Sequence, residues 1–268
     1  MKKSSCFAVI TATCLLVFYI IWAVVTQSPP FIRVCGKPYF AYSRSCNVDI
    51  DISDDRQTKI YSLDSLKYMK WLNVLYIEGY SDIVVKDYSF LSSCTRLKEF
   101  HSSYMNIQDL SIFSELTDLE VLDLNMYCDN MDGGHNNVTD ITVLTKLTKL
   151  KSISLNGKGL TDISALENLN ALESLWIRGS SVADLNSLKN HTNLKQLFIL
   201  DDKDLSDISA LESCQSLEVV CLIGSNADNA SVLMKLCNLK ELRIDNGMLS
   251  AEQISILKRN GVNVYLAK

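Results

Sequence analysis

Residues of the three types that form a hydrolytic triad occur at equivalent places in successive segments of the chain. His101, Asp123 and Ser154 each take the middle position of a segment that alternates apolar and polar residues. If these segments are neighbouring strands, the side chains stand in a row about 4.8 Å apart. A triad needs the histidine between the nucleophile and the acid, but here the aspartate is central, and no oxyanion hole is evident. We therefore predict that the protein is not an enzyme.

Five aspartates recur in the pattern apolar-x-Asp-Ile/Leu: Asp109, Asp140, Asp162, Asp184 and Asp207. A row of carboxylates can bind a metal or act in catalysis. Each of these, however, precedes a short apolar segment where a helical turn begins, and there a carboxylate accepts backbone N–H groups. The sequence therefore predicts a structural role for them. The three histidines form no cluster with metal-ligand spacing, so we predict no metal and no cofactor.

The elements that position these residues come from an internal repeat. Leu-x-x-Leu-x-Leu-like segments recur at intervals of about 22 residues, beginning at Leu72, Leu97, Leu119, Leu150, Leu172, Leu194, Leu217 and Leu239, with a last copy at Gly261. Alternation of this kind indicates a half-buried strand. The apolar residues that follow each segment are spaced by three, as in Leu160, Ile163, Leu166 and Leu169, which favours a tight helical or 3₁₀ return. One such unit cannot bury its own apolar face, but stacked units share a core.

This pattern resembles the leucine-rich repeat family, in particular the bacterial internalin-like and SDS22-like class of 22-residue repeats. The signature Leu-x-x-Leu-x-Leu-x₄-Ile/Leu-x-Asp-Ile/Leu-x-x-Leu recurs over about residues 58–268, for example at Leu160-Thr-Asp-Ile163. The resemblance implies an α/β solenoid, a right-handed superhelix with a concave parallel sheet and short helical or 3₁₀ convex returns. We expect about nine strands. A repeat fold of this kind says little about function.

An apolar N-terminal run predicts a membrane anchor. Residues 6–25 carry no charge and follow Lys2 and Lys3. At about 1.5 Å per residue these 20 residues span about 30 Å, the thickness of a bilayer core. The lysines favour a cytoplasmic N-terminus, so the repeats are expected outside the cytoplasmic membrane on a single-pass anchor. A signal peptide cleaved between residues 23 and 30 is the alternative. The predicted organisation is a transmembrane anchor (1–27), a linker and N-terminal cap (28–71), and the repeat array with its C-terminal cap (72–268).

The chain departs from the family pattern in three respects. The asparagine that usually follows the strand is replaced at Met105, Lys158, Ser180, Ser225 and Gly247, so we expect a looser rim. Cys94 and Cys214 stand where other repeats carry leucine and are predicted to be buried thiols. An insertion at residues 125–137 is predicted to be a surface loop, either an ordinary polar one or one that overhangs the concave face.

Both ends of the array carry features of caps. Near the N-terminus a strand is expected at residues 48–52, and Cys35 and Cys46 either form a disulfide or remain free. At the C-terminal end Ser250 and Gln253 fit a capping box that opens a short helix. Gly261 is expected to end that helix, and the final strand then closes the stack.

Charge and composition limit the partners. The chain has 26 Lys+Arg against 31 Asp+Glu, a net charge of −5, so it has no basic footprint and nucleic acid is not expected to bind. Nine cysteines in 268 residues are too few for a disulfide scaffold.

Function is predicted on the concave face, where side chains between the core leucines point outward. The first half of this face is polar, and the second half has an apolar centre rimmed by charge. Exposed aromatic clusters rimmed by charge mark interaction sites. The predicted ligand-binding residues are Trp176, Arg178, Phe198, Leu200, Val219, Cys221, Ile223, Arg243 and Tyr265. The six apolar residues from Trp176 to Ile223 are expected to form an exposed cluster on three strands.

Three classes of function remain open. The favoured one is a surface-displayed binding module that recognises a protein or peptide through the concave face. A structural envelope spacer is the second. An intracellular scaffold like the phosphatase regulators of this fold is the third, and the export signal opposes it.

Overall fold

A computed structural model describes residues 31–35, 37–49, 59–78, 83–85, 87–103, 107–124 and 137–267. The predicted transmembrane segment, residues 1–27, and most of the predicted surface loop, residues 125–136, lie outside these ranges. Among the described residues, no helix combines the length and the apolar character that a membrane span needs.

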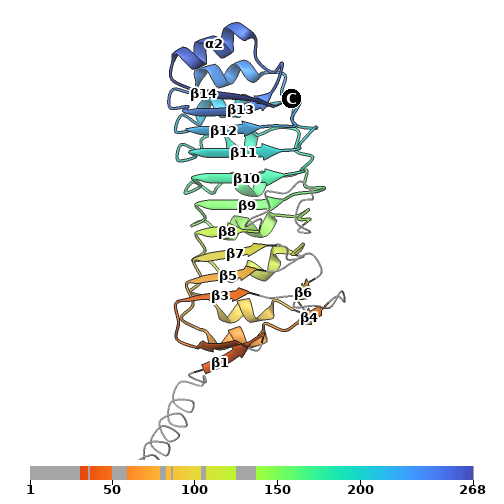
Figure 1. The fold of residues 1–268 in the computed structure, drawn as a ribbon, viewed down its shortest axis with the longest axis vertical. Coiled ribbons are helices and arrows are strands. Elements are labelled where there is room, and N and C mark those ends of the chain that lie inside the picture. Colours follow the sequence, from red (N-terminus) through yellow and green to blue (C-terminus); the bar gives the residue numbers. More distant parts are fainter. Residues whose placement is uncertain are drawn as a thin grey trace, which may run out of the picture.

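A single parallel sheet of ten strands runs the length of the described chain, and its strands stack in chain order (Figure 1). They are β3 (Ser45–Asp49), β5 (Val74–Glu78), β7 (Glu99–Ser103), β8 (Val121–Asp123), β9 (Ser152–Asn156), β10 (Ser174–Arg178), β11 (Gln196–Leu200), β12 (Val219–Leu222), β13 (Glu241–Asp245) and β14 (Asn263–Ala267). The repeats supply the nine predicted strands, β5 and β7 to β14. The tenth, β3, comes from the N-terminal cap and pairs with β5.

The cap strand begins at Ser45, three residues before the predicted start. Its register with β5 explains the shift, because Cys46 lies beside Leu75 and Val48 beside Ile77, with all four side chains buried. The alternation that faces the core therefore includes Cys46, which acts here as a small apolar residue.

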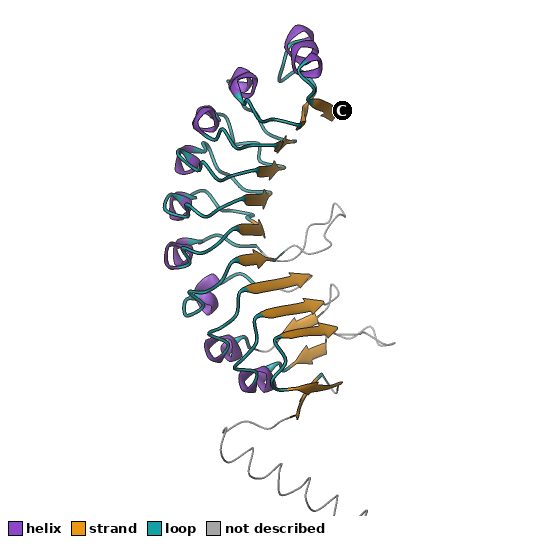
Figure 2. Cartoon of the chain, turned by 90° about the vertical axis from the view of Figure 1, so that its left-hand side faces the viewer, coloured by secondary structure: helices purple, strands orange, loops and turns teal. Residues whose placement is uncertain are grey.

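Strands β3, β5 and β7 to β12 of this sheet are each followed by a tight return on the opposite side of the molecule, as the spacing by three predicts. The returns are the 3₁₀ helices η1 (Asp64–Tyr68), η2 (Ser89–Ser93), η3 (Leu110–Phe113), η4 (Thr142–Lys146), η5 (Ser164–Leu166), η6 (Asn186–Leu188), η7 (Ser209–Ser213) and η8 (Ala230–Lys235). Figure 2 shows the array as an arc, with the strands along its inner side and the returns along its outer side. The sheet is therefore concave.

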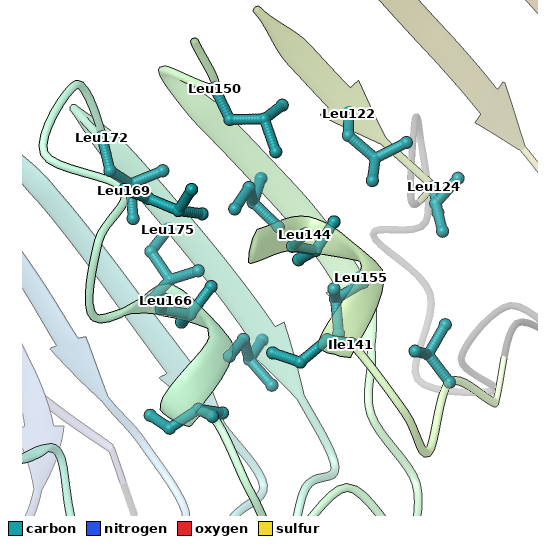
Figure 3. Close-up of a cluster of buried hydrophobic side chains, with 14 of the residues drawn as sticks. Leu122, Leu124, Ile141, Leu144, Leu150, Leu155, Leu166, Leu169, Leu172 and Leu175 are labelled. Atoms are coloured by element: carbon teal, nitrogen blue, oxygen red, sulfur yellow. The ribbon is translucent and has the colours of Figure 1, made fainter. Parts of the chain in front are cut away.

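Leucines between the two layers form one continuous core. Leu150, Leu172 and Leu175, from strand segments, meet Leu144 and Leu166, from returns, and all are fully buried (Figure 3). Each buried leucine contributes about 1.5–3 kcal/mol relative to an exposed one. Because every coil shares this core with the coils above and below, the array is held together by contacts between neighbouring repeats.

A ladder of alternating charges follows the first leucine of the seven repeats that begin at Leu97 to Leu239. Glu120 accepts hydrogen bonds from Lys98 at 2.8 Å and from Lys151 at 2.7 Å. Further along, Lys195 pairs with Glu173 and Lys240 with Glu218. These pairs are largely exposed, so each contributes little to stability. Their alternation does disfavour a shift by one repeat, which would bring like charges together.

The two ends of the described array are covered differently. At the N-terminal end, β1 (Phe31–Val34) and β2 (Lys37–Phe40) form an antiparallel hairpin, and β4 (Lys59–Tyr61) pairs in parallel with β6 (Ile83–Val85). At the C-terminal end, α2 (Ala251–Arg259) begins at the predicted capping box, in which Ser250 accepts from the Gln253 N–H. Gly261 follows with a φ of +88°, a conformation that glycine adopts readily.

Candidate binding face on the concave sheet

One row of side chains crosses the concave face from end to end. The strand register places the middle outward residues of β5 and β7 to β14 side by side. In order they are Tyr76, His101, Asp123, Ser154, Trp176, Phe198, Cys221, Arg243 and Tyr265. Successive residues in such a row lie about 4.8 Å apart. The row therefore has a polar first part, with an aromatic pair near its centre and a cationic and aromatic end.

The central pair is a stacked indole and phenyl ring. Trp176 of β10 and Phe198 of β11 have ring centroids 3.7 Å apart and planes inclined by 22°. Trp176 remains 39% exposed, whereas Phe198 is only 8% exposed. Since two rigid aromatic side chains brace each other, the exposed indole is held in one orientation before any ligand arrives.

The predicted exposed cluster is wrong in two of its members. Phe198 and Cys221 point to the concave side as expected, but both are buried. An aromatic ring is wider than the strand spacing, so the indole of Trp176 covers Phe198 from one side. Leu200, Val219 and Ile223 are partly buried. The exposed part of this apolar cluster is therefore centred on Trp176.

Arg178, at the end of β10, is fixed by a carboxylate that sequence analysis did not find. Its Nε lies 2.8 Å from Oδ2 of Asp201. Asp201 adopts a left-handed conformation, with a φ of +57°, and Gly224 of the next coil packs directly against its backbone. The sequence offers a weak sign of this arrangement, the acidic pair Asp201-Asp202 directly after the strand.

Arg243 and Tyr265 form the last part of the row. The guanidinium of Arg243 lies 5.6 Å from the ring centre of Tyr265, within the range of a cation–π contact. Its Nε also donates to Glu241 Oε1 at 2.6 Å. Both Arg243 and Tyr265 are exposed. This end of the face presents an arginine whose charge is already partly balanced.

His101, Asp123 and Ser154 are adjacent in the row, in the order that their spacing predicts. His101 Nδ1 lies 3.5 Å from Asp123 Oδ2, and its ring stacks on Tyr76 with centroids 4.4 Å apart. Its other ring nitrogen lies 3.4 Å from Glu99 Oε2. Both histidine nitrogens thus face carboxylates, and Asp123 separates the histidine from Ser154. Among the described residues, no three His, Cys, Asp or Glu side chains are grouped so that they could hold a metal ion.

The five repeated aspartates have the structural role predicted for them. Each carboxylate accepts the backbone N–H of the residue two positions ahead, at 2.7–2.9 Å: Asp109 from Ser111, Asp140 from Thr142, Asp162 from Ser164, Asp184 from Asn186 and Asp207 from Ser209. These backbone hydrogen bonds lower the pKa of Asp140, Asp162 and Asp207. These aspartates thus bind free backbone N–H groups at the start of the returns.

A buried carboxylate takes the place of the family asparagine after β11. Asp202 is fully buried, and it accepts hydrogen bonds from the Ser180 hydroxyl and from the Val182 N–H at 3.1 Å. The N–H of Asp204 donates to its other oxygen at 3.2 Å. Burial raises the pKa of Asp202 against these hydrogen bonds. Ser180 and Asp202 thus provide polar links between coils where the asparagine ladder was expected to be missing.

The cysteines are thiols in the described part of the chain. Cys35 and Cys46 are free, so the disulfide considered for them is not formed in this structure. Cys94 and Cys214 are fully buried as predicted, with Cys94 Sγ 3.5 Å from the Phe90 carbonyl oxygen. Burial raises the pKa of Cys94 to about 12.

Comparisons with known proteins support the fold. No protein-family profile matches the sequence, and no curated protein matches it. An internalin from Listeria monocytogenes has a similar structure, with 25% identity and a TM-score of 0.66 over 82% of this chain and 61% of that one. Internalin C2 from the same organism shows 28% identity and a TM-score of 0.59 over 68% and 75% of the two chains. A leucine-rich repeat protein from Leptospira interrogans shares the fold at 17% identity, with a TM-score of 0.63 over 82% and 54%. The chain thus spans less than two thirds of the first internalin.

Proposed function

We propose that this leucine-rich repeat protein is a binding module that recognises a protein or peptide across the concave face of its sheet. The observation that carries the proposal is the Trp176–Phe198 stack. A tryptophan held rigid and left 39% exposed near the middle of a concave surface has the properties of a binding hot spot. It offers a large contact area and loses little conformational freedom when a ligand binds.

The shape of the row suggests how the ligand lies. Trp176 and Tyr265 stand on strands four steps apart, a distance of about 19 Å, which an extended peptide of about six residues covers. Between them lie the buried Phe198 and Cys221 and the exposed Arg243. A ligand with an apolar or aromatic side chain near one end and a hydrogen-bond acceptor toward the other end matches this order. Arg178 and Arg243 already face carboxylates, so the ligand need not be strongly acidic.

We propose further that the module is displayed outside the cytoplasmic membrane on the apolar run at residues 6–25. The support is the sequence alone: twenty uncharged residues preceded by Lys2 and Lys3. In this arrangement the concave face is available to ligands from outside the cell. Protease treatment of intact cells tests the orientation, because an exported array is degraded while a cytoplasmic control protein survives.

The stacked pair favours binding over the structural spacer considered from the sequence. A spacer needs no half-exposed indole on its inner face, and a wholly polar face would serve it better. The intracellular scaffold requires the repeats to be in the cytoplasm, which the charges before the apolar run oppose.

A selection experiment tests the binding function. The full chain in detergent or nanodiscs is used to select peptides from a random displayed library, and the enriched peptides are then measured against single variants. We expect Trp176→Ala to weaken binding by about 2 kcal/mol or more, as hot-spot residues do. Ser154→Ala, on the polar part of the same row, is expected to change it little.

Trp71→Ala is the matched control for that experiment. Trp71 is also a half-exposed tryptophan, but it lies before β5 at the other end of the array. Peptides that depend equally on Trp71 and Trp176 would show general stickiness of exposed indoles. Peptides that bind Trp176→Ala with full affinity would rule out the concave site.

A further inference from the structure

The outermost surface of the N-terminal cap is aromatic. In the β1–β2 hairpin, Ile32 and Val34 face the core, whereas Phe31 and Phe40 face outward. These two phenylalanines are register partners with ring centroids 5.5 Å apart, and they are 63% and 47% exposed. Figure 1 shows β1 at the extreme end of the array, away from the repeats. No described element of the fold covers this pair.

The aromatic surface continues into a depression beside η1. Phe40 contacts Tyr42 with ring centroids 5.6 Å apart, and Tyr42 lines a depression of about 460 Å³ together with Trp71. Trp71 is 44% exposed, and the guanidinium of Arg96 lies 4.2 Å from its ring centre. Lys70 completes the rim. We call the surface formed by Phe31, Phe40, Tyr42, Lys70, Trp71 and Arg96 the cap patch.

The cap patch is cationic although the chain is acidic. The described residues that line the depression include Lys70 and Arg96 and no carboxylate, whereas the whole chain carries a net charge of −5. Aromatic side chains beside basic ones are the combination found where proteins meet the headgroup region of a bilayer. Indole and phenol rings prefer that interface, and lysine and arginine interact with lipid phosphates.

The chain itself holds this patch close to the predicted membrane span. Only residues 26–30 separate the apolar run at residues 6–25 from Phe31. The six Cα–Cα steps from Val25 to Phe31 reach at most about 22 Å even when fully extended. If the run spans a bilayer, Phe31 therefore cannot move farther than that from the membrane surface, and the whole cap patch stays near it.

We propose that the cap patch lies on the outer surface of an anionic bilayer, with its rings in the interface and with Lys70 and Arg96 on lipid phosphates. The array then stands on the membrane at a fixed inclination and presents its concave sheet in one direction. The inference rests on the anchoring proposed above and is independent of the ligand of the concave face.

Depth-dependent quenching of tryptophan fluorescence tests this docking in the full chain. The chain has three tryptophans, Trp22, Trp71 and Trp176. Trp22→Phe with Trp176→Phe leaves Trp71 as the only tryptophan, and Trp22→Phe with Trp71→Phe leaves Trp176 as the matched control. Both are placed in nanodiscs whose anionic lipids carry bromine on their acyl chains near the headgroup.

We expect the brominated lipids to quench most of the Trp71 emission and little of the Trp176 emission. Adding Lys70→Glu and Arg96→Glu to the Trp71-only chain should restore much of the lost emission, because two cations near an anionic surface are each replaced by an anion. Near-ultraviolet and far-ultraviolet circular dichroism of each variant verifies that the fold is retained.

The outcomes separate the docking from the anchoring. If the chain stays with the nanodiscs but Trp71 is quenched no more than Trp176, docking of the patch is wrong and the anchor stands. If the chain does not stay with the nanodiscs at all, both are wrong. Quenching that is equal in purely zwitterionic nanodiscs, and unchanged by the two glutamates, would overturn the role assigned to Lys70 and Arg96.

Discussion

Gly224 lies so close to Asp201 of the preceding coil that a Cβ on Gly224 would stand 2.9 Å from the Asp201 Cα and 3.0 Å from its nitrogen. Both residues have positive φ, +82° and +57°. The contact places the Asp201 carboxylate where it binds Arg178, at 2.8 Å. A glycine distant in sequence from Arg178 thus positions one of the charges of the concave face.

Gly224→Ala is therefore expected to destabilise the protein by about 2 kcal/mol or more, since it combines an unfavourable φ with backbone overlap. Urea unfolding of the full chain measures this. Gly179→Ala is the control, because Gly179 also has a positive φ, +69°, but has nothing near its missing Cβ. It should cost only the conformational strain, about 1 kcal/mol. Equal losses for the two variants would show that the contact with Asp201 is not tight.

Leu175 and Ser174 test which side of a strand faces the core. Leu175 of β10 is fully buried, whereas its neighbour Ser174 lies on the concave side and is partly exposed. Leu175→Ala should lower the free energy of unfolding by about 2–5 kcal/mol through lost contacts and a cavity. Ser174→Ala should change it by less than about 0.5 kcal/mol. Similar losses at both positions would contradict the observed alternation.

The repeat period predicted the fold because each leucine position meets one simple requirement. The apolar side chains of the strand and of the return must both face the space between the two layers. Leu150, Leu172 and their equivalents therefore lie where the spacing places them. Asp140 and its equivalents were also predictable, since a carboxylate before a short return has a local partner. The start of β3 was missed because Cys46 was not counted as a core residue.

The details of the concave face depend on contacts between coils, which a linear pattern does not contain. Alternation correctly placed Phe198 and Cys221 on that face, but both are buried there. Phe198 is covered by the Trp176 ring one strand away, and Cys221 is a small side chain between Phe198 and Arg243 in the row. The Asp201–Gly224 contact joins residues 23 positions apart, which only the three-dimensional stacking of turns brings together. Asp202 was overlooked because its burial and its hydrogen bonds to Ser180 and Val182 of the preceding coil do not appear in the linear pattern.

Asp202 should make stability decrease as the pH rises. Burial raises its pKa in the folded protein above the ordinary value of 3.8, so the folded state binds a proton that the unfolded state has already lost. The resulting stabilisation is complete below pH 3.8 and is lost as the pH rises through the raised pKa. In Asp202→Asn this dependence is absent. The difference in unfolding free energy, wild type minus variant, should therefore fall with rising pH. A difference that stays constant, or that grows with pH, would contradict the cause assigned to the shift.

Glu120 should show the opposite dependence on pH. Hydrogen bonds from Lys151 and Lys98 lower its pKa from 4.5 to about 2. Its contribution to stability is present above pH 4.5 and is lost as the pH falls toward 2. Glu120→Gln should remove this acid-sensitive part. Because both lysines are largely exposed, added salt should also weaken it. Unfolding measured between pH 5 and pH 2 at low and high salt decides the matter, and an effect that salt leaves unchanged would contradict a surface ion-pair origin.

Substitutions of Trp176 and Phe198 should have different main effects, on ligand binding and on the free energy of unfolding respectively. Trp176 is exposed, so Trp176→Ala should weaken peptide binding by about 2 kcal/mol or more with little effect on unfolding. Phe198 is buried beside it, so Phe198→Ala should destabilise the protein by about 1–3 kcal/mol, at the lower end for a buried aromatic that lies at a surface. It should also weaken binding, because the indole loses the ring that holds it in place.

If positioning is the only role of Phe198 in binding, the double variant should bind no worse than Trp176→Ala alone. Calorimetry on the four proteins of this cycle measures the coupling. Additive losses in binding would show that Phe198 touches the ligand directly.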